Sequence, residues 1–200
     1  MTTQNVAIFL FDDVEVLDFA GPYEVFCTAA RVLQRVAPQE APALNVFNVA
    51  AHQTDVRARG NLQVRAHYHF NDHPDIDVLI IPGGVVTAEL QKEDVIEWIQ
   101  KQSHKARLIA SVCTGAFLLA RAGLLDGLMA TTHWEDINDL RCMFPAVNVQ
   151  ENQRWIDNGY LVTSAGISAG IDMSLHLVET LCGRDTALKT ARQMEYVWND

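Results

Sequence analysis

Cys113 has the surroundings that a nucleophilic cysteine requires. It directly follows an apolar segment, 107–112, and precedes the small residues of a helical pattern that starts at Thr114. A side chain on such a strand-to-helix turn is held exposed at the top of a sheet, and the N-terminus of the helix favours a reactive thiolate. We therefore expect Cys113 to react below about pH 8. The alternative is an inert cysteine buried in the core.

Two glycines follow a second apolar segment. Gly83 and Gly84 come after Pro82, at the end of the segment 77–81. Glycine lets a backbone approach a ligand closely and turn its N–H groups toward an anion. The alternative is an ordinary loop after a strand.

Asp18 lies among apolar residues shortly after the first apolar segment, 6–11. Burial would raise the pKa of its carboxyl group and make it a proton donor or shuttle. The alternative is an Asp that accepts N–H bonds at the start of a helix. His133, between Thr132 and Trp134, either lines the same site or contacts backbone at a helix start.

Strands and helices alternate along the chain. Continuous apolar runs predict buried strands at 6–11, 43–51, 77–81 and 107–112. Helical spacing predicts helices with Pro22 in the first turn of the first one, then at 93–105, 114–125, around 134–140, at 169–182 and at 185–194. Residues 56–66 alternate on both sides of Gly60-Asn61, which predicts a β-hairpin, and shorter strands are expected at 147–149, 154–156 and 160–163.

This order predicts an α/β fold with a mostly parallel sheet and helices on both faces. Ligands of such folds bind beyond the carboxyl ends of the strands. Asp18, Gly83-Gly84 and Cys113 all fall at such ends, so we expect them to meet in one site.

The composition excludes several classes of protein. The 200 residues suit a single domain, 1–200, and 49% hydrophobic with 20% charged residues is typical of a packed chain. A formal charge of −10 gives no basic surface for nucleic acid or an anionic membrane. We see neither a membrane-spanning run nor a signal peptide, so a cytoplasmic location is expected.

Cysteine and histidine usage does not favour a metal site. Four cysteines without a Cys-x-x-Cys pair predict neither a disulfide framework nor structural zinc, and Cys27, Cys142 and Cys182 are interpreted as packing residues. His67, His69 and His73 lie near several aspartates. We interpret this cluster as a polar loop rather than as metal ligands.

The motifs together resemble the ThiJ/PfpI superfamily, the class I glutamine amidotransferase-like proteins. The resemblance covers almost the whole chain, in the expected order. It is carried by Leu17-Asp18-Phe19-Ala20-Gly21-Pro22, Ile80-Ile81-Pro82-Gly83-Gly84, Ser111-Val112-Cys113-Thr114-Gly115-Ala116, Ala130-Thr131-Thr132-His133-Trp134 and Ser164 to Asp172. It implies a flavodoxin-like three-layer fold, no cofactor and a homodimer.

Within the superfamily the chain is most similar to the isocyanide hydratase branch, which uses a Cys followed by Thr together with an Asp. These positions are Cys113, Thr114 and Asp18 here. The resemblance implies that Cys113 attacks a small-molecule isocyanide to give a thioimidate, and that Asp18 donates a proton and later activates water. Backbone N–H groups of Gly84 and Thr114 are expected to stabilise the negative charge that develops during the reaction. The Thr114 hydroxyl is expected to form a hydrogen bond with the Cys113 sulfur.

Other branches fit less well. The proteases and deglycases carry His directly after the nucleophile, where this chain has Thr114. Glutamine hydrolysis needs a late His and Glu two residues apart, whereas His176 and Glu179 are three apart. The second hypothesis is a non-catalytic sensing domain, either like those of AraC-type regulators or oxidised at Cys113. The chain length and acidic charge argue against a DNA-binding region.

Overall fold

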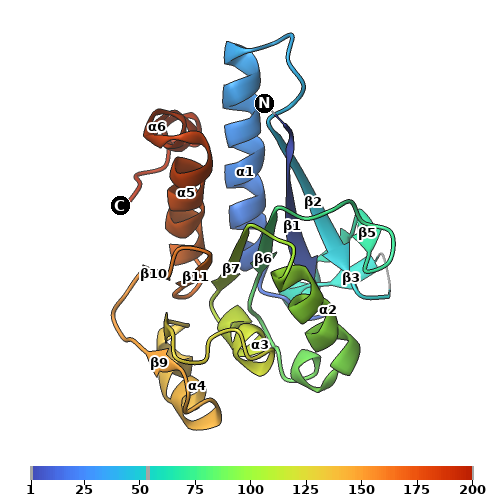
Figure 1. Cartoon of the computed structure of the whole chain (residues 1–200), viewed down its shortest axis with the longest axis vertical. Helices are drawn as coiled ribbons and strands as arrows, with labels where there is room; N and C mark the ends of the chain where they lie inside the picture. The colour runs from blue at the N-terminus through green and yellow to red at the C-terminus, as the bar shows by residue number, and fades with distance from the viewer. Residues whose placement is uncertain (1, 53–54, 200) are drawn as a thin grey trace.

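Seven strands form one sheet in the order β10-β11-β7-β6-β1-β2-β5 in the computed structural model, which describes residues 2–52 and 55–199 (Figure 1). Neighbouring strands are parallel except for the antiparallel pair β10–β11. The strands are β1 (Gln4–Leu10), β2 (Leu44–Ala50), β5 (Tyr68–His69), β6 (Val78–Ile81), β7 (Leu108–Val112), β10 (Trp155–Asp157) and β11 (Leu161–Ser164).

Helices cover both faces of this sheet. From β1 to β2 the chain moves toward one edge, and from β6 to β7 it moves toward the other. Because parallel crossovers are right-handed, these two connections place their helices on opposite faces. The helices are α1 (Val16–Val36), α2 (Glu93–Ser103), α3 (Gly115–Arg121), α4 (Ile137–Met143), α5 (Ala169–Cys182) and α6 (Arg184–Gln193). On one face α1 packs with α5 and α6, and on the other face α2 packs with α3.

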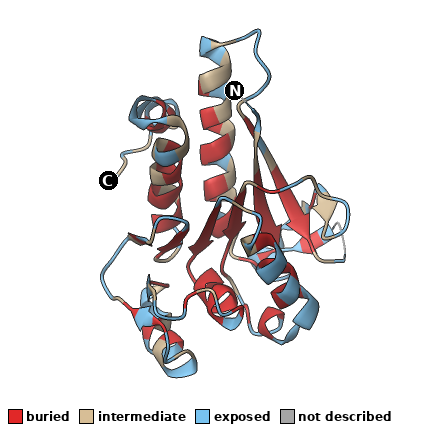
Figure 2. Cartoon of the chain, viewed as in Figure 1, coloured by how far each residue is buried: buried red, intermediate tan, exposed pale blue. Residues whose placement is uncertain are grey.

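The core lies on the central strands. Every residue of β6 and β7 is buried, as are Ala7 to Leu10 of β1 (Figure 2). Helices on both sides leave these strands no solvent-facing side, which explains their continuous apolar runs. The flavodoxin-like three-layer prediction is confirmed.

Smaller elements complete the fold. The predicted hairpin is present as β3 (Asp55–Arg57) and β4 (Gln63–Arg65), joined through Gly60 and Asn61 at φ values of 67° and 63°. A second pair consists of β8 (Met129–Ala130) and β9 (Asn148–Val149). No helix within residues 2–52 and 55–199 is long and apolar enough to cross a membrane.

Two predicted helix boundaries are wrong. Pro22 lies inside α1 and not in its first turn, because the helix already begins at Val16, where the Glu15 carboxylate accepts the Val16 N–H at 3.2 Å. Asp18 is therefore in the first turn of α1. The helix after Cys113 ends at Arg121 rather than at 125, since the chain turns at Gly123 with φ 75°.

Candidate active site

Cys113 occupies the sharp turn between β7 and α3. Its backbone is in the left-handed region, at φ 57°, which is uncommon for a residue with a side chain. Its N–H donates to the carbonyls of Ser164 and Ala165 at 3.2 and 3.3 Å, and its carbonyl accepts the Thr132 hydroxyl at 2.8 Å. The neighbouring segments thus hold the backbone of Cys113 in its strained conformation, and the side chain is 7% exposed.

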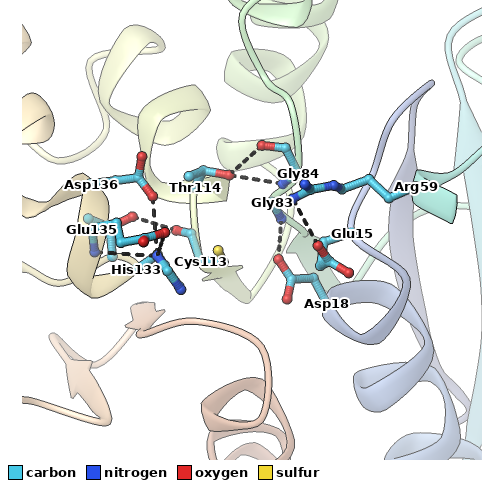
Figure 3. A network of polar contacts seen from close by, with 11 residues as sticks. Glu15, Asp18, Arg59, Gly83, Gly84, Cys113, Thr114, His133, Glu135 and Asp136 are labelled. Atoms are coloured by element: carbon cyan, nitrogen blue, oxygen red, sulfur yellow. Dashed lines mark hydrogen bonds and ion pairs between the residues drawn. The ribbon is translucent and has the colours of Figure 1, made fainter.

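Asp18 is the acidic partner of this thiol. Its side chain is fully buried, and its carboxylate lies close to the Cys113 sulfur (Figure 3). The Oδ2 atom accepts the Gly83 N–H at 3.2 Å, whereas the buried Oδ1 atom has no hydrogen-bond partner among the described residues. Burial, assisted by the charge of Glu15, raises the pKa of Asp18 to about 7. The expected upward shift by burial is confirmed.

The thiol itself is not acidified by the helix. Burial first, and then the negative charge of Asp18, raise the pKa of Cys113 to about 12, although the Thr114 N–H acts in the other direction. The expectation that the helix N-terminus lowers this pKa is wrong, because desolvation outweighs the few N–H groups at the turn.

The two groups titrate as a pair. One proton leaves the pair near pH 7 and the second only near pH 12, and because the higher pKa belongs to Cys113, the single proton held between these values lies mainly on sulfur. In one arrangement the proton is on sulfur. In the other, a thiolate accepts a hydrogen bond from a neutral Asp18, which is a nucleophile beside an acid.

Gly83 and Gly84 are tied to Thr114 and Asp18. The Thr114 hydroxyl accepts the Gly84 N–H and donates to the Gly84 carbonyl, both at 2.9 Å (Figure 3). A Cβ on Gly83 would lie 2.6 Å from the Thr114 nitrogen and 2.9 Å from the Asp18 carboxylate, so the close approach requires glycine. The Gly84 N–H and the Thr114 hydroxyl already have partners. We therefore revise two expectations: that the Gly84 N–H stabilises negative charge, and that the Thr114 hydroxyl forms a hydrogen bond with the sulfur.

Replacing Thr114 by valine is expected to destabilise the fold. Thr114→Val keeps the shape but leaves the Gly84 N–H and carbonyl without their hydroxyl partner, at a cost of about 1–3 kcal/mol in the free energy of unfolding. Urea unfolding measures this cost. Thr114→Ser retains the hydroxyl and serves as the matched control. Equal stability of the valine variant and wild type would contradict the structural role of this hydroxyl.

His133 starts a short 3₁₀ turn, Trp134–Asp136, as one of its two interpretations predicts. It also lines a pocket, but neither Cys113 nor Asp18 belongs to the lining, so its role in the catalytic site stays a prediction. Its Nδ1 lies 3.4 Å from the Asp136 carboxylate and accepts the Glu135 N–H at 3.4 Å. A Cβ on Gly166 would lie 2.1 Å from its ring, so the glycine lets the ring pack directly on the backbone.

Sequence reasoning assigned no role to three contributors to the site: Thr132, which donates to the Cys113 carbonyl, Gly166, and Ile167, which lies beside Asp18. Ile167 has φ 51°, another left-handed residue. The family motifs contained all three residues, but no residue type or spacing in them indicated a contact with Cys113 or Asp18.

Two further carboxylates of this region have cationic partners. Glu15, whose charge acts on Asp18, pairs with Arg59 at 3.1 Å, and Glu24 pairs with Arg31 at 2.9 Å. In the part of the chain that the structure describes, no three His, Cys, Asp or Glu side chains gather closely enough to hold a metal ion. Cys142 is exposed rather than packed, which corrects that expectation.

Histidines of the 67–73 segment have structural partners. The Nδ1 atom of His67 accepts the Asn48 N–H at 3.1 Å, and its ring stacks on Tyr23. The Nε2 atom of His73 accepts the Trp98 indole N–H at 3.1 Å. These two rings therefore support the packing of the sheet edge.

Comparison with known proteins places this fold and site in a family. Residues 4–180 match the DJ-1/PfpI family, and the chain belongs to it. It is 36% identical over 193 residues to the isonitrile hydratase of Pseudomonas putida, covering 96% of this chain and 78% of that protein. It is 28% identical to the HTH-type transcriptional regulator GbdR of Pseudomonas aeruginosa, covering 96% of this chain and 51% of the regulator.

Solved structures agree with this assignment. A ThiJ/PfpI family protein from Pseudomonas syringae superimposes with a TM-score of 0.85 at 26% identity, covering all of this chain and 78% of that one. DJ-1β of Drosophila melanogaster superimposes with a TM-score of 0.81 at 18% identity, covering 98% and 100% of the two chains, which supports the fold alone.

Proposed function

We propose that this protein is a cysteine-dependent hydratase that converts a small-molecule isocyanide and water into an N-substituted formamide. The observation that carries the proposal is the buried pair of Cys113, held on the strained turn after β7, and Asp18, whose pKa is raised by burial to about 7. Such a pair supplies a nucleophile and an acid to the same atom. The 36% identity to an isonitrile hydratase supports the same chemistry.

The first half of the reaction forms a covalent intermediate. The Cys113 thiolate attacks the terminal carbon of the isocyanide, and a C–S bond forms while the carbon gains negative charge. Asp18 transfers its proton to that carbon. The product of this half is a thioimidate, in which the former isocyanide carbon carries one hydrogen, the sulfur and a double bond to nitrogen.

The second half releases the product. The Asp18 carboxylate takes a proton from water, and the hydroxide adds to the thioimidate carbon. The C–S bond then breaks, the nitrogen gains the hydroxyl proton, and a formamide leaves. Sulfur departs as a thiolate that accepts the Thr114 N–H, and Asp18 is protonated again, so the site returns to its starting state.

Turnover of an isocyanide tests this proposal. We expect wild-type protein incubated with an aryl or alkyl isocyanide to produce the corresponding formamide, detected by liquid chromatography. Cys113→Ala removes the nucleophile and is expected to abolish production, whereas the matched control Cys142→Ala, at an exposed cysteine, retains it. Absence of turnover by wild type, or turnover that persists in Cys113→Ala, would reject the hydratase.

The second candidate is a non-catalytic sensing domain. It is favoured by the similarity to GbdR, of which this chain spans about half the length. A sensor would bind a small molecule, or be oxidised at Cys113, without releasing product. The turnover assay separates the two candidates. Assembly as a homodimer stays a prediction.

A further inference from the structure

A pocket of about 480 Å³ opens beside the catalytic pair. Three segments line it: 131–138 around the start of α4, 151–154 in the connection from β9 to β10, and 165–169 before α5. Its volume is in the range of sites that hold small organic ligands. Neither Cys113 nor Asp18 lines this pocket, so the reaction described above leaves it without a role.

The three segments are fastened to each other, so the pocket is preformed. Arg141 of α4 pairs with Glu151 at 2.5 Å. The Ala165 N–H donates to the Arg154 carbonyl at 2.9 Å. The ring of His133 packs directly on Gly166. A ligand therefore meets walls that are already in place, which reduces the entropy lost on binding.

Three lining residues adjoin the catalytic pair. Thr132 donates to the Cys113 carbonyl, Ala165 accepts the Cys113 N–H, and the Ile167 N–H acts on the pKa of the Asp18 carboxyl. Each of these three residues lies in or directly beside a lining segment. A molecule whose reactive carbon lies at the sulfur therefore has the pocket as the adjacent space for its substituent.

One part of the lining is apolar. Trp134 is 75% exposed, Ile167 is 38% exposed, and Ile137 joins them in the lining. An exposed indole next to an exposed branched side chain offers a flat aromatic group a large apolar contact area. A ligand that covers these side chains removes them from water.

The polar part of the lining is uncharged overall. It contains the amide side chains of Asn138, Asn152 and Gln153, which donate and accept hydrogen bonds. The ionisable lining residues have partners within the protein: Glu151 pairs with Arg141, Arg154 with Asp172, and His133 with Asp136. Among the described residues, each ionisable side chain of the lining therefore already has an oppositely charged partner, so the pocket does not favour a charged ligand.

We propose that this pocket binds the substituent of the molecule that Cys113 attacks, and that it selects an uncharged aryl group bearing a hydrogen-bonding substituent. The aryl ring lies against Trp134 and Ile167, and its polar substituent meets the amides of Asn152 and Gln153. This inference rests on the proposed function only in taking Cys113 as the reacting group.

Binding of formamides, the expected products, tests the pocket without requiring catalysis. The probes are N-(4-hydroxyphenyl)formamide, N-(4-carboxyphenyl)formamide and N-methylformamide, titrated into the protein by calorimetry. We expect the hydroxyphenyl compound to bind wild type at least about tenfold more tightly than N-methylformamide. Trp134→Ala is expected to lower the affinity for the hydroxyphenyl compound about tenfold. Tyr160→Ala, at an aromatic residue that is 55% exposed and outside the lining, leaves it unchanged.

The second part of the experiment changes the charge of the pocket. Asn152→Asp adds a negative charge and is expected to weaken binding of the carboxyphenyl compound about fivefold relative to binding of the hydroxyphenyl compound. The matched control is Asn61→Asp, because Asn61 and Asn152 are both exposed and have similar φ values of 63° and 56°. This control is expected to leave the ratio of the two affinities unchanged.

The outcomes separate the pocket from the reaction. Undetectable binding of the hydroxyphenyl compound, or an equal effect of Trp134→Ala and Tyr160→Ala, overturns the pocket even if isocyanides are hydrated. Binding that is lost in Trp134→Ala, together with no isocyanide turnover by wild type, supports the pocket and rejects the hydratase.

Discussion

Asp18→Asn is expected to lower formamide production by about 10²–10⁴-fold, because it removes the proton that the reacting carbon must receive. The amide retains the shape of the side chain and can still accept the Gly83 N–H. It cannot release or regain a proton near pH 7. The rate of formamide formation by the variant and by wild type, compared at the same neutral pH, measures the loss.

The same variant is expected to change the pH dependence of Cys113. In wild type, burial and the charge of Asp18 raise the pKa of Cys113 to about 12, so alkylation of Cys113 should become fast only in strongly alkaline solution. In Asp18→Asn that charge is absent, although burial still keeps the pKa of the thiol above that of a free cysteine. The midpoint of alkylation therefore moves downward, and peptide mass spectrometry follows it at Cys113 with exposed Cys142 as the reference.

Stability gives an independent measurement of the buried carboxyl group. The pKa of Asp18 is 3.8 in the unfolded reference and about 7 in the fold, so the folded chain holds an extra proton between these values. Stability must therefore fall as pH rises from about 4 to 7 and stay level above that range. Asp18→Asn removes this fall and should be more stable than wild type above pH 7 by a few kcal/mol.

Glu15→Gln is the matched control, since Glu15 is a neighbouring carboxylate that is not bonded to the sulfur. Its charge raises the pKa of Asp18, so its removal should lower that pKa, leave the alkylation midpoint of Cys113 unchanged and retain most of the turnover. If Asp18→Asn and Glu15→Gln behaved alike, the assignment of Asp18 as the acid would be wrong.

Gly115→Ala is expected to destabilise the protein by about 3 kcal/mol or to prevent folding. An added Cβ would lie 2.1 Å from the Ile81 carbonyl oxygen and 3.0 Å from the Pro82 carbonyl carbon. Both are backbone atoms at the end of β6, so the strand must move away from α3. That movement displaces Gly83, which binds Asp18, and activity should fall with stability.

Gly21→Ala serves as the control for this substitution. Its added Cβ meets only side-chain atoms, the nearest at 3.0 Å on Ile171, and α1 gains helix propensity. Denaturant unfolding should therefore show a change within about 1 kcal/mol. A Gly115→Ala variant as stable as Gly21→Ala would contradict the close contact between β6 and α3.

The strand ends were predictable from sequence because each follows a buried apolar run. Parallel strands must end at one edge of the sheet, and this alone brought Asp18, Gly83 and Cys113 together. The start of α1 was misplaced because Pro22 is a strong local signal, whereas the Glu15 cap that begins the helix has no comparable one. Local pattern therefore predicted the elements better than their boundaries.

The electrostatics of the site were less predictable. Whether a helix end or desolvation decides the pKa of Cys113 depends on how much chain covers the sulfur, and residues 164–167 provide part of that cover. The binding pocket depends on three segments that are distant in sequence. No spacing rule encodes the contact of His133 with Gly166, since it requires the completed fold.

The backbone bonds of Cys113 have a consequence for biosynthesis. A chain is made from its N-terminus, and the carbonyls of Ser164 and Ala165 that hold the Cys113 N–H emerge about fifty residues later. Until then the thiol has neither its cover nor the Ile167 amide beside Asp18, and it should titrate as a free cysteine. The raised pKa values of Cys113 and Asp18 therefore arise only when the last third of the chain has folded, and the nascent thiol is more reactive than the mature one.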